Sequence, residues 1–132
     1  MIEFKITSTQ LISEEDINDI MTTALEGGIT HWCGRVKINY DKHNNIIGIP
    51  ENKRVDVNYA SDVIGYGGSL TLYDIEKEDG PWVLTREKFI EGIKLEMKRS
   101  DIWSITDLVE NHDAETADCI VQYALFGEVV YG

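Results

Sequence analysis

The chain has 132 residues, a length that suits one domain built around a single hydrophobic core. Its hydrophobic fraction of 42% is ordinary for a folded protein, and no segment is apolar enough for a signal peptide or a membrane span. The net charge of −12 excludes the basic footprint that direct nucleic-acid binders normally carry. We therefore expect a single domain over residues 1–132 in the cytoplasm, with its two cysteines reduced.

The carboxylates are concentrated in two segments that lack basic residues. Between Ile6 and Gly34 there are five acids and no Lys or Arg, and after Arg99 there are seven acids and again no basic residue. These twelve carboxylates equal the whole net charge, because the other twelve acids are balanced by twelve bases elsewhere. Such a surface often serves solubility alone. It also predicts a face that binds a basic partner.

The first predicted elements are a strand and a helix. Alternating apolar residues at positions 2, 4 and 6 indicate a half-buried strand. The clearest helix follows over residues 13–27, where Ser13 is a natural N-cap and Gly27 is placed to end the helix. Its apolar residues repeat at helical spacing and form one stripe: Ile17, Ile20, Met21, Ala24 and Leu25. The acids of this helix therefore face outward.

The middle of the chain predicts an antiparallel sheet. Residues 29–40 show the alternation of an extended segment, and residues 41–54 contain the turn formers of a loop. A short helix ended by glycines is expected over residues 59–68. The alternating residues 70–75 then lead through a turn into residues 82–85, which predicts an antiparallel hairpin.

Two further helices are expected in the last third of the chain. Thr85 caps the first of them, whose buried face carries Phe89, Ile90, Ile93 and Met97. Gly127 ends or bends the second, whose apolar stripe comprises Ala117, Ile120, Val121, Ala124 and Leu125. We therefore predict an α+β domain in which about three main helices pack on a small antiparallel sheet.

His31 and Cys33 are the residues that most resemble the start of a chemical site. In a strand they would project to the same face, and with His112 and Cys119 they complete a four-ligand zinc set on paper. The spacing matches no compact zinc motif, and no local signature marks Cys33 as a nucleophile with a histidine base. We therefore expect no metal, no cofactor and no catalytic residue. The His-Trp-Cys strand should pack into the core, with Trp32 on the opposite face.

Two loops superficially resemble ligand sites. The glycine-rich residues 65–69 would need a helix N-terminus directly after them to hold a phosphate, but a strand follows, so we expect a turn. Residues 41–52 resemble a calcium loop, yet Ile46 stands at the required glycine position and Asn52 at the required glutamate position. Neither loop predicts a ligand.

Several segments resemble, in the same order, a family of small proteins encoded by bacteriophages and prophages of Gram-positive and related bacteria. The segments are "DINDIMTTALEGGITHWC", "YASDVIGYGGSLTLYD", "WVLTREKFIEGIKL" and "ADCIVQYALFGEVVYG". The resemblance spans most of the chain and is strongest over residues 24–33 and 122–132. It carries no activity, cofactor or catalytic residue with it. What it implies is a small phage accessory protein that acts in a bacterial cytoplasm.

We therefore expect a non-enzymatic binding protein that presents acids to a basic host or phage macromolecule. One version is a nucleic-acid mimic that occupies the basic groove of a DNA-handling or defence protein. Membrane binding and direct nucleic-acid binding are not expected, and the sequence carries no signal for an oligomeric state. The candidate partner-binding residues lie on the polar faces of the first and last helices: Glu15, Asp19, Glu115 and Asp118.

Two alternatives stay open. The first is a small-molecule binder that sequesters a nucleotide signal, with Arg35, Lys53 and Arg54 as its cations. A deep pocket that contains Arg35 or Arg54 would favour it. The second is a small hydrolase or transferase, which His31 and Cys33 within hydrogen-bond reach at a cleft would favour.

Overall fold

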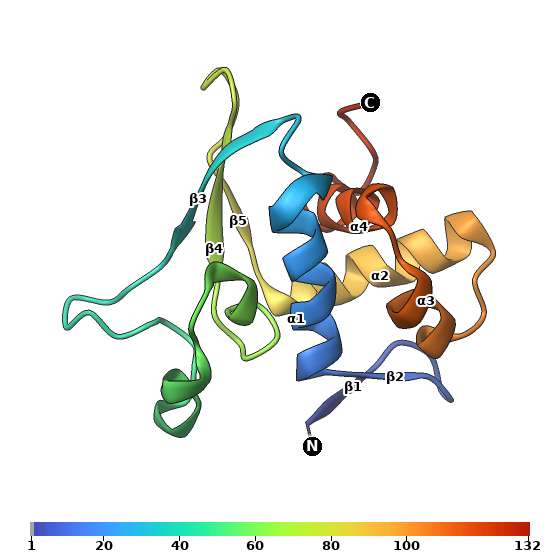
Figure 1. Ribbon diagram of the computed structural model, residues 1–132, viewed down its shortest axis with the longest axis horizontal. Coiled ribbons are helices and arrows are strands. Elements are labelled where there is room, and N and C mark those ends of the chain that lie inside the picture. The colour runs from blue at the N-terminus through green and yellow to red at the C-terminus, as the bar shows by residue number, and fades with distance from the viewer. Residues whose placement is uncertain (1) are drawn as a thin grey trace.

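A computed structural model describes residues 2–132 as an α+β fold, with a helical half beside a three-stranded sheet (Figure 1). The α-helices are α1 (Glu14–Thr23), α2 (Arg86–Ser100), α3 (Ile105–Asn111) and α4 (Ala114–Phe126). The strands are β1 (Glu3–Lys5), β2 (Leu11–Ser13), β3 (Cys33–Ile38), β4 (Leu70–Asp74) and β5 (Trp82–Leu84). No helix within residues 2–132 combines the length and the apolar character needed to cross a bilayer.

Helix α1 begins as the sequence predicts and ends differently. Ser13 is the N-cap, and its hydroxyl accepts a hydrogen bond of 3.1 Å from the backbone N–H of Asp16. The α-helical form stops at Thr23, and the chain continues as a wider π-helical turn over Ala24–Gly28 instead of ending at a glycine cap. A Cβ on Gly28 would lie only 2.7 Å from the carbonyl oxygen of Ala114, so glycine permits this turn to approach α4.

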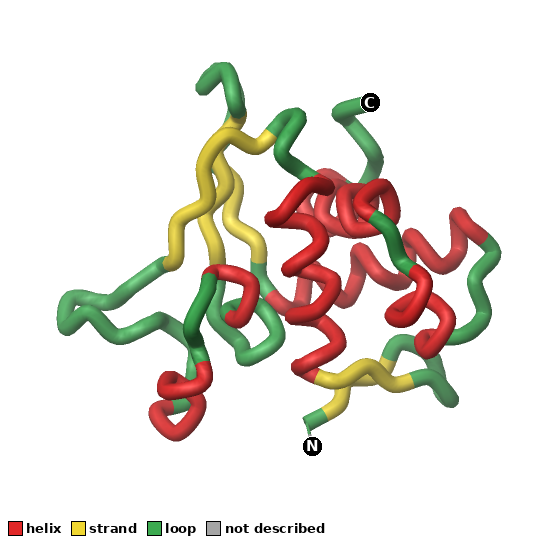
Figure 2. The backbone as a smooth tube through the Cα atoms, in the orientation of Figure 1, coloured by secondary structure: helices red, strands yellow, loops and turns green. Residues whose placement is uncertain are grey.

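The sheet has the strand order β3-β4-β5, and all its pairs are antiparallel (Figure 2). The predicted β4–β5 hairpin is confirmed, with Leu70 opposite Leu84. On the other side of β4, Val36 of β3 faces Leu72, and a bulge at Gly34 shifts the register. Strand β3 is therefore an irregular edge of the sheet.

The helical core is built around α4, which lies against α1, α2 and β5 (Figure 1). Gly92 allows α2 to touch α4, because a Cβ there would collide with the carbonyl oxygen of Ile120. Thr85 caps α2 and Gly127 ends α4 with a φ of 73°, as the sequence predicts. Six consecutive residues of α4 are buried, two of them polar or charged: Ala117, Asp118, Cys119, Ile120, Val121 and Gln122.

Three short elements differ from the sequence-based expectation. The helix α3 was not expected, and it brings the number of α-helices within residues 2–132 to four. The first strand pairs with the unexpected β2 in a separate two-stranded sheet, and Ile2, placed on its buried side by the alternation, is 50% exposed. Elements of three to seven residues are too short to show a clear hydrophobic period.

Candidate functional site

The His-Trp-Cys segment forms a turn, and only its last residue belongs to a strand. β3 begins at Cys33, so His31 and Cys33 do not share a strand face, which corrects that expectation. The side chain of His31 is 44% exposed, whereas Trp32 is buried in the core. The Cys33 thiol donates to the carbonyl oxygen of Arg35 at 3.4 Å, and burial raises its pKa.

The other two residues of the hypothetical zinc set lie elsewhere. Both ring nitrogens of His112 are engaged, Nδ1 at 2.7 Å from the carbonyl oxygen of Val109 and Nε2 at 2.8 Å from the hydroxyl of Thr23. Burial raises the pKa of the Cys119 thiol, and the nearby Glu96 carboxylate raises it further. Within residues 2–132, His, Cys, Asp and Glu side chains form no group of three that could hold a metal ion.

Asp118 is not on a polar face, so the expectation that it meets solvent is wrong. Its exposed fraction is 7%, and Oδ1 accepts hydrogen bonds of 2.7 Å from Trp32 Nε1 and 2.9 Å from Gln122 Nε2. The reason is that α4 is packed on several sides, so that its polar residues in the middle are also enclosed. Asp118 therefore organises the core and is unsuited to contact a partner.

Gln122, one turn after Asp118 on α4, binds the last residues of the chain. The side-chain oxygen of Gln122 accepts hydrogen bonds of 2.8 Å from the backbone N–H groups of Val130 and Tyr131, and its amide nitrogen donates to the carbonyl oxygen of Tyr131 at 3.0 Å. The Tyr131 ring lies parallel to Trp32 with 5.1 Å between ring centres. Trp82 and Phe126 pack edge-on against this pair. Sequence reasoning missed this cluster, because its members lie far apart in the chain.

The glycine-rich residues 65–68 form a turn, as expected. The Gly65 N–H donates to Asn18 Oδ1 at 2.8 Å, and Arg86 donates to the Gly65 carbonyl oxygen at 3.2 Å. A Cβ at Gly65 would collide with the carbonyl oxygen of Glu14 and with the Asn18 side chain. The absence of a side chain at Gly65 therefore lets this loop pack closely against α1.

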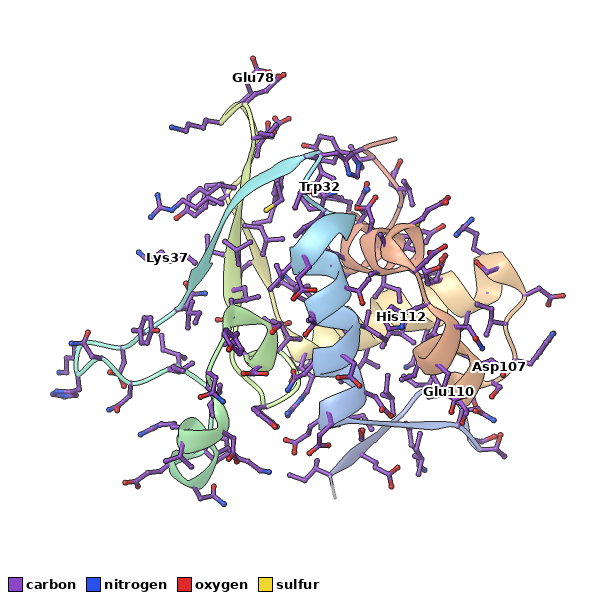
Figure 3. The ribbon with its side chains drawn as sticks, viewed as in Figure 1. Trp32, Lys37, Glu78, Asp107, Glu110 and His112 are labelled. Carbon is purple, nitrogen blue, oxygen red and sulfur yellow. The ribbon has the colours of Figure 1, made fainter. Side chains whose placement is uncertain are left out.

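Helices α1 and α3 contact each other, and each carries exposed carboxylates. Figure 3 labels the two on α3, Asp107 and Glu110. We call Glu15, Asp19, Asp107 and Glu110 the acidic surface; all four are exposed, and none belongs to an ion pair within residues 2–132. The contact between Thr23 and His112 joins the C-terminal ends of α1 and α3. The sequence predicted the two acids on α1 and missed the two on α3.

Partial burial and repulsion from neighbouring acids act on Asp19. Burial raises the pKa of its carboxyl group most, and the charges of Asp16 and Glu15 raise it further, while His112 partly opposes them. Burial is thus the main reason that the charged form of Asp19 is disfavoured in the folded protein.

Glu115 is exposed on the first turn of α4, one turn before Cys119. Its carboxylate is among the charges that raise the pKa of the Cys119 thiol, after burial and Glu96. Glu115 stays an exposed candidate for contact with a partner, but it lies on α4 and not on α1 or α3, so the acidic surface as defined above does not include it.

Two grooves meet at Trp103, which is 80% exposed in the segment between α2 and α3. The first has a volume of about 640 Å³ and lies between residues 6–10 and the end of α2, where it includes Lys94 and Lys98. The second, of about 480 Å³, lies between the α2–α3 segment and the start of α4. Neither of these two grooves includes Arg35, Arg54, His31 or Cys33.

Comparison of the chain with protein families, with curated proteins and with solved structures found no significant match.

Proposed function

We propose that this chain is a non-enzymatic binding protein whose acidic surface engages a basic macromolecule. The observation that carries the proposal is the set of exposed carboxylates on two neighbouring helices without a cation among them: Glu15, Asp19, Asp107 and Glu110. Unpaired charges of one sign attract an oppositely charged partner and steer its approach. At physiological salt this attraction extends over about 8 Å from the surface.

One carboxylate of the acidic surface, that of Asp19, is disfavoured in its charged form, mainly by partial burial. Asp19 has a raised pKa, which means that its charged form is disfavoured in the folded protein. A neutral side chain at this exposed position would avoid that cost. Charges that oppose folding are typical of binding surfaces, where function and stability compete.

The partner that fits best is a protein with a basic groove, such as one that handles DNA. Carboxylates reproduce the negative charge of phosphates, whereas the chain itself, with a net charge of −12, would be repelled by a nucleic acid. The resemblance to phage-encoded proteins agrees with a nucleic-acid mimic that acts on a bacterial host protein. We place its action in the bacterial cytoplasm for the same reason.

The cations expected for the alternative, a nucleotide binder, each have a partner within the fold. The Arg35 guanidinium lies 5.0 Å from the centre of the Tyr73 ring, and Arg54 Nε donates to the carbonyl oxygen of Ile49 at 3.2 Å. Lys53 lies 3.9 Å from the buried carboxylate of Glu14. These three side chains are therefore engaged within the fold.

A charge-reversal experiment with a matched control tests the proposal. One variant replaces the acidic surface by lysines (Glu15→Lys, Asp19→Lys, Asp107→Lys, Glu110→Lys). The control reverses four exposed acids elsewhere (Glu51→Lys, Asp56→Lys, Glu76→Lys, Glu78→Lys), so both proteins have the same net charge.

Binding is measured to a panel of purified basic DNA-binding proteins at increasing salt, with circular dichroism as the check on folding. We expect the natural chain to bind a panel member with an affinity that falls as salt rises. The acidic-surface variant should lose that binding, and the control should largely retain it. Equal losses in both variants would show that net charge alone is responsible and would contradict the proposal.

A further inference from the structure

Trp103 is a large, solvent-exposed apolar side chain beside the acidic surface. It is 80% exposed, whereas Trp32 is 1% exposed. A tryptophan is among the side chains that gain most from burial, and exposed tryptophans are frequent energetic anchors of interfaces. Its position between two grooves leaves its ring open to an incoming group.

The two grooves beside Trp103 differ in charge. The first includes Lys94 and Lys98 together with Asp101. The second includes Asp101 and Asp107 and no lysine or arginine, and we call it the acidic groove. Asp107 belongs to the acidic surface defined above, so the acidic groove is continuous with that surface.

Backbone charge adds to the negative character of the acidic groove. Asp101, which lines it, follows the last residue of the 15-residue helix α2, where unpaired carbonyl groups concentrate partial negative charge. The start of α4 also reaches the groove at Thr116, but its N–H is already bonded to the carboxylate of Asp113 at 2.8 Å. His112 also lines the groove, but both of its ring nitrogens have partners, so the two carboxylates and the end of α2 favour a cation there.

We infer that the acidic groove receives an arginine side chain of the partner, stacked on the Trp103 indole and paired with Asp107 and Asp101. Guanidinium is the cation that fits both features, because it is planar, stacks on aromatic faces and pairs with carboxylates through two parallel hydrogen bonds. A lysine ammonium is a more strongly hydrated point charge and satisfies only the carboxylates. The groove volume of about 480 Å³ accommodates such a side chain.

The inference rests on the proposed function, since it names the side chain with which a basic partner enters the acidic surface. Its test uses two fluorescein-labelled peptides, Gly-Arg-Gly-Arg-Gly and Gly-Lys-Gly-Lys-Gly, which have the same length and charge. Fluorescence anisotropy gives their affinities for the natural chain and for Trp103→Ala, Trp103→Phe and Asp107→Asn. Tyr59→Ala is the matched control, because Tyr59 is another exposed aromatic residue, at 73%.

The natural chain should bind the arginine peptide roughly three- to fivefold more tightly than the lysine peptide. Trp103→Ala should remove this preference, and Trp103→Phe should retain part of it. Asp107→Asn should weaken both peptides, whereas Tyr59→Ala should change nothing. Thermal unfolding of each variant confirms that the fold is intact.

The possible failures separate the inference from the proposed function. If the natural chain binds both peptides equally, or binds neither while it still binds a basic protein, the arginine groove is refuted and the acidic surface stands. A second outcome is that Trp103→Ala removes the arginine preference while the four-lysine variant still binds the basic proteins as tightly as the natural chain does. In that case the groove stands and the broad acidic surface falls. A Trp103→Ala variant that keeps the full preference overturns the inference.

Discussion

The indole of Trp32 donates a hydrogen bond of 2.7 Å to the buried carboxylate of Asp118, which joins the turn before β3 to the middle of α4. The same carboxylate oxygen accepts the amide of Gln122, and Gln122 in turn holds the backbone of Tyr131. Tyr131 then stacks on Trp32 and closes the ring of contacts. A buried carboxylate is tolerated here because Oδ1 accepts from two donors and Oδ2 lies 3.6 Å from His31 Nε2.

Removing the carboxylate should therefore destabilise the fold strongly. Asp118→Ala leaves the donors of Trp32 and Gln122 without their acceptor, and we expect a loss of about 2–4 kcal/mol in the free energy of unfolding. Glu115→Ala, on the exposed side of the same helix, should change it by less than about 0.5 kcal/mol. Urea unfolding followed by circular dichroism measures both. Similar losses at the two positions would contradict the buried role of Asp118.

Gln122→Ala should release the C-terminal tail while leaving most of the core in place. The variant loses the side-chain hydrogen bonds to Val130 and Tyr131, so these two amides should exchange with solvent much faster than in the natural chain. Hydrogen exchange followed by NMR measures the effect. Glu128→Gln, a change of an exposed residue in the same tail, serves as the control. Unchanged protection of both amides in Gln122→Ala would refute the anchoring role of the glutamine.

Asp19→Asn should make the protein more stable at neutral pH. Burial raises the pKa of Asp19 above the ordinary value of an aspartate, so its contribution to stability is present below that ordinary value and is lost as pH rises through the folded-state pKa. At pH 7 the charged group is therefore unfavourable, and an amide removes the cost. Urea unfolding at pH 7 should show a higher midpoint for Asp19→Asn, with a smaller difference near pH 3. A lower midpoint at pH 7 would contradict this sign.

Two glycines that look alike in sequence should respond differently to alanine. At Gly65 a Cβ would collide with the backbone of Glu14 and the side chain of Asn18, so Gly65→Ala should cost more than about 2 kcal/mol. At Gly27 a Cβ would meet nothing within 4 Å, so Gly27→Ala should be neutral or stabilising by up to about 1 kcal/mol. Thermal unfolding of both variants measures the contrast. Comparable destabilisation at the two sites would argue against the packing of the glycine loop on α1.

The sequence predicts the helix starts and the hairpin, because these features depend on residues that are close together in the chain. Ser13 and Thr85 cap the helices that follow them, because a cap needs only a hydroxyl and the next turn of backbone. The β4–β5 hairpin follows from alternation and a turn within a few residues. The short α3 and β2 leave no such periodic signal.

The position of Asp118 shows what a helical pattern leaves undetermined. The spacing of apolar residues on α4 identifies one buried face, but it does not tell how many other elements enclose the helix. The partners of Asp118, above all Trp32, are distant in the chain. Glu15 and Asp19 lie on a helix with one open side, so the same reasoning places them in solvent. Trp103 is a tryptophan in the short segment between two helices, and this position could have indicated the groove from the sequence.

The bulge in the edge strand β3 affects how readily the protein aggregates. An open strand edge can pair with the same edge of another molecule and start an intermolecular sheet. Here the bulge at Gly34 distorts the edge, and the exposed Arg35 and Lys37 would face each other in a symmetric antiparallel pairing centred on Val36. These two cations thus oppose aggregation through this edge of the sheet.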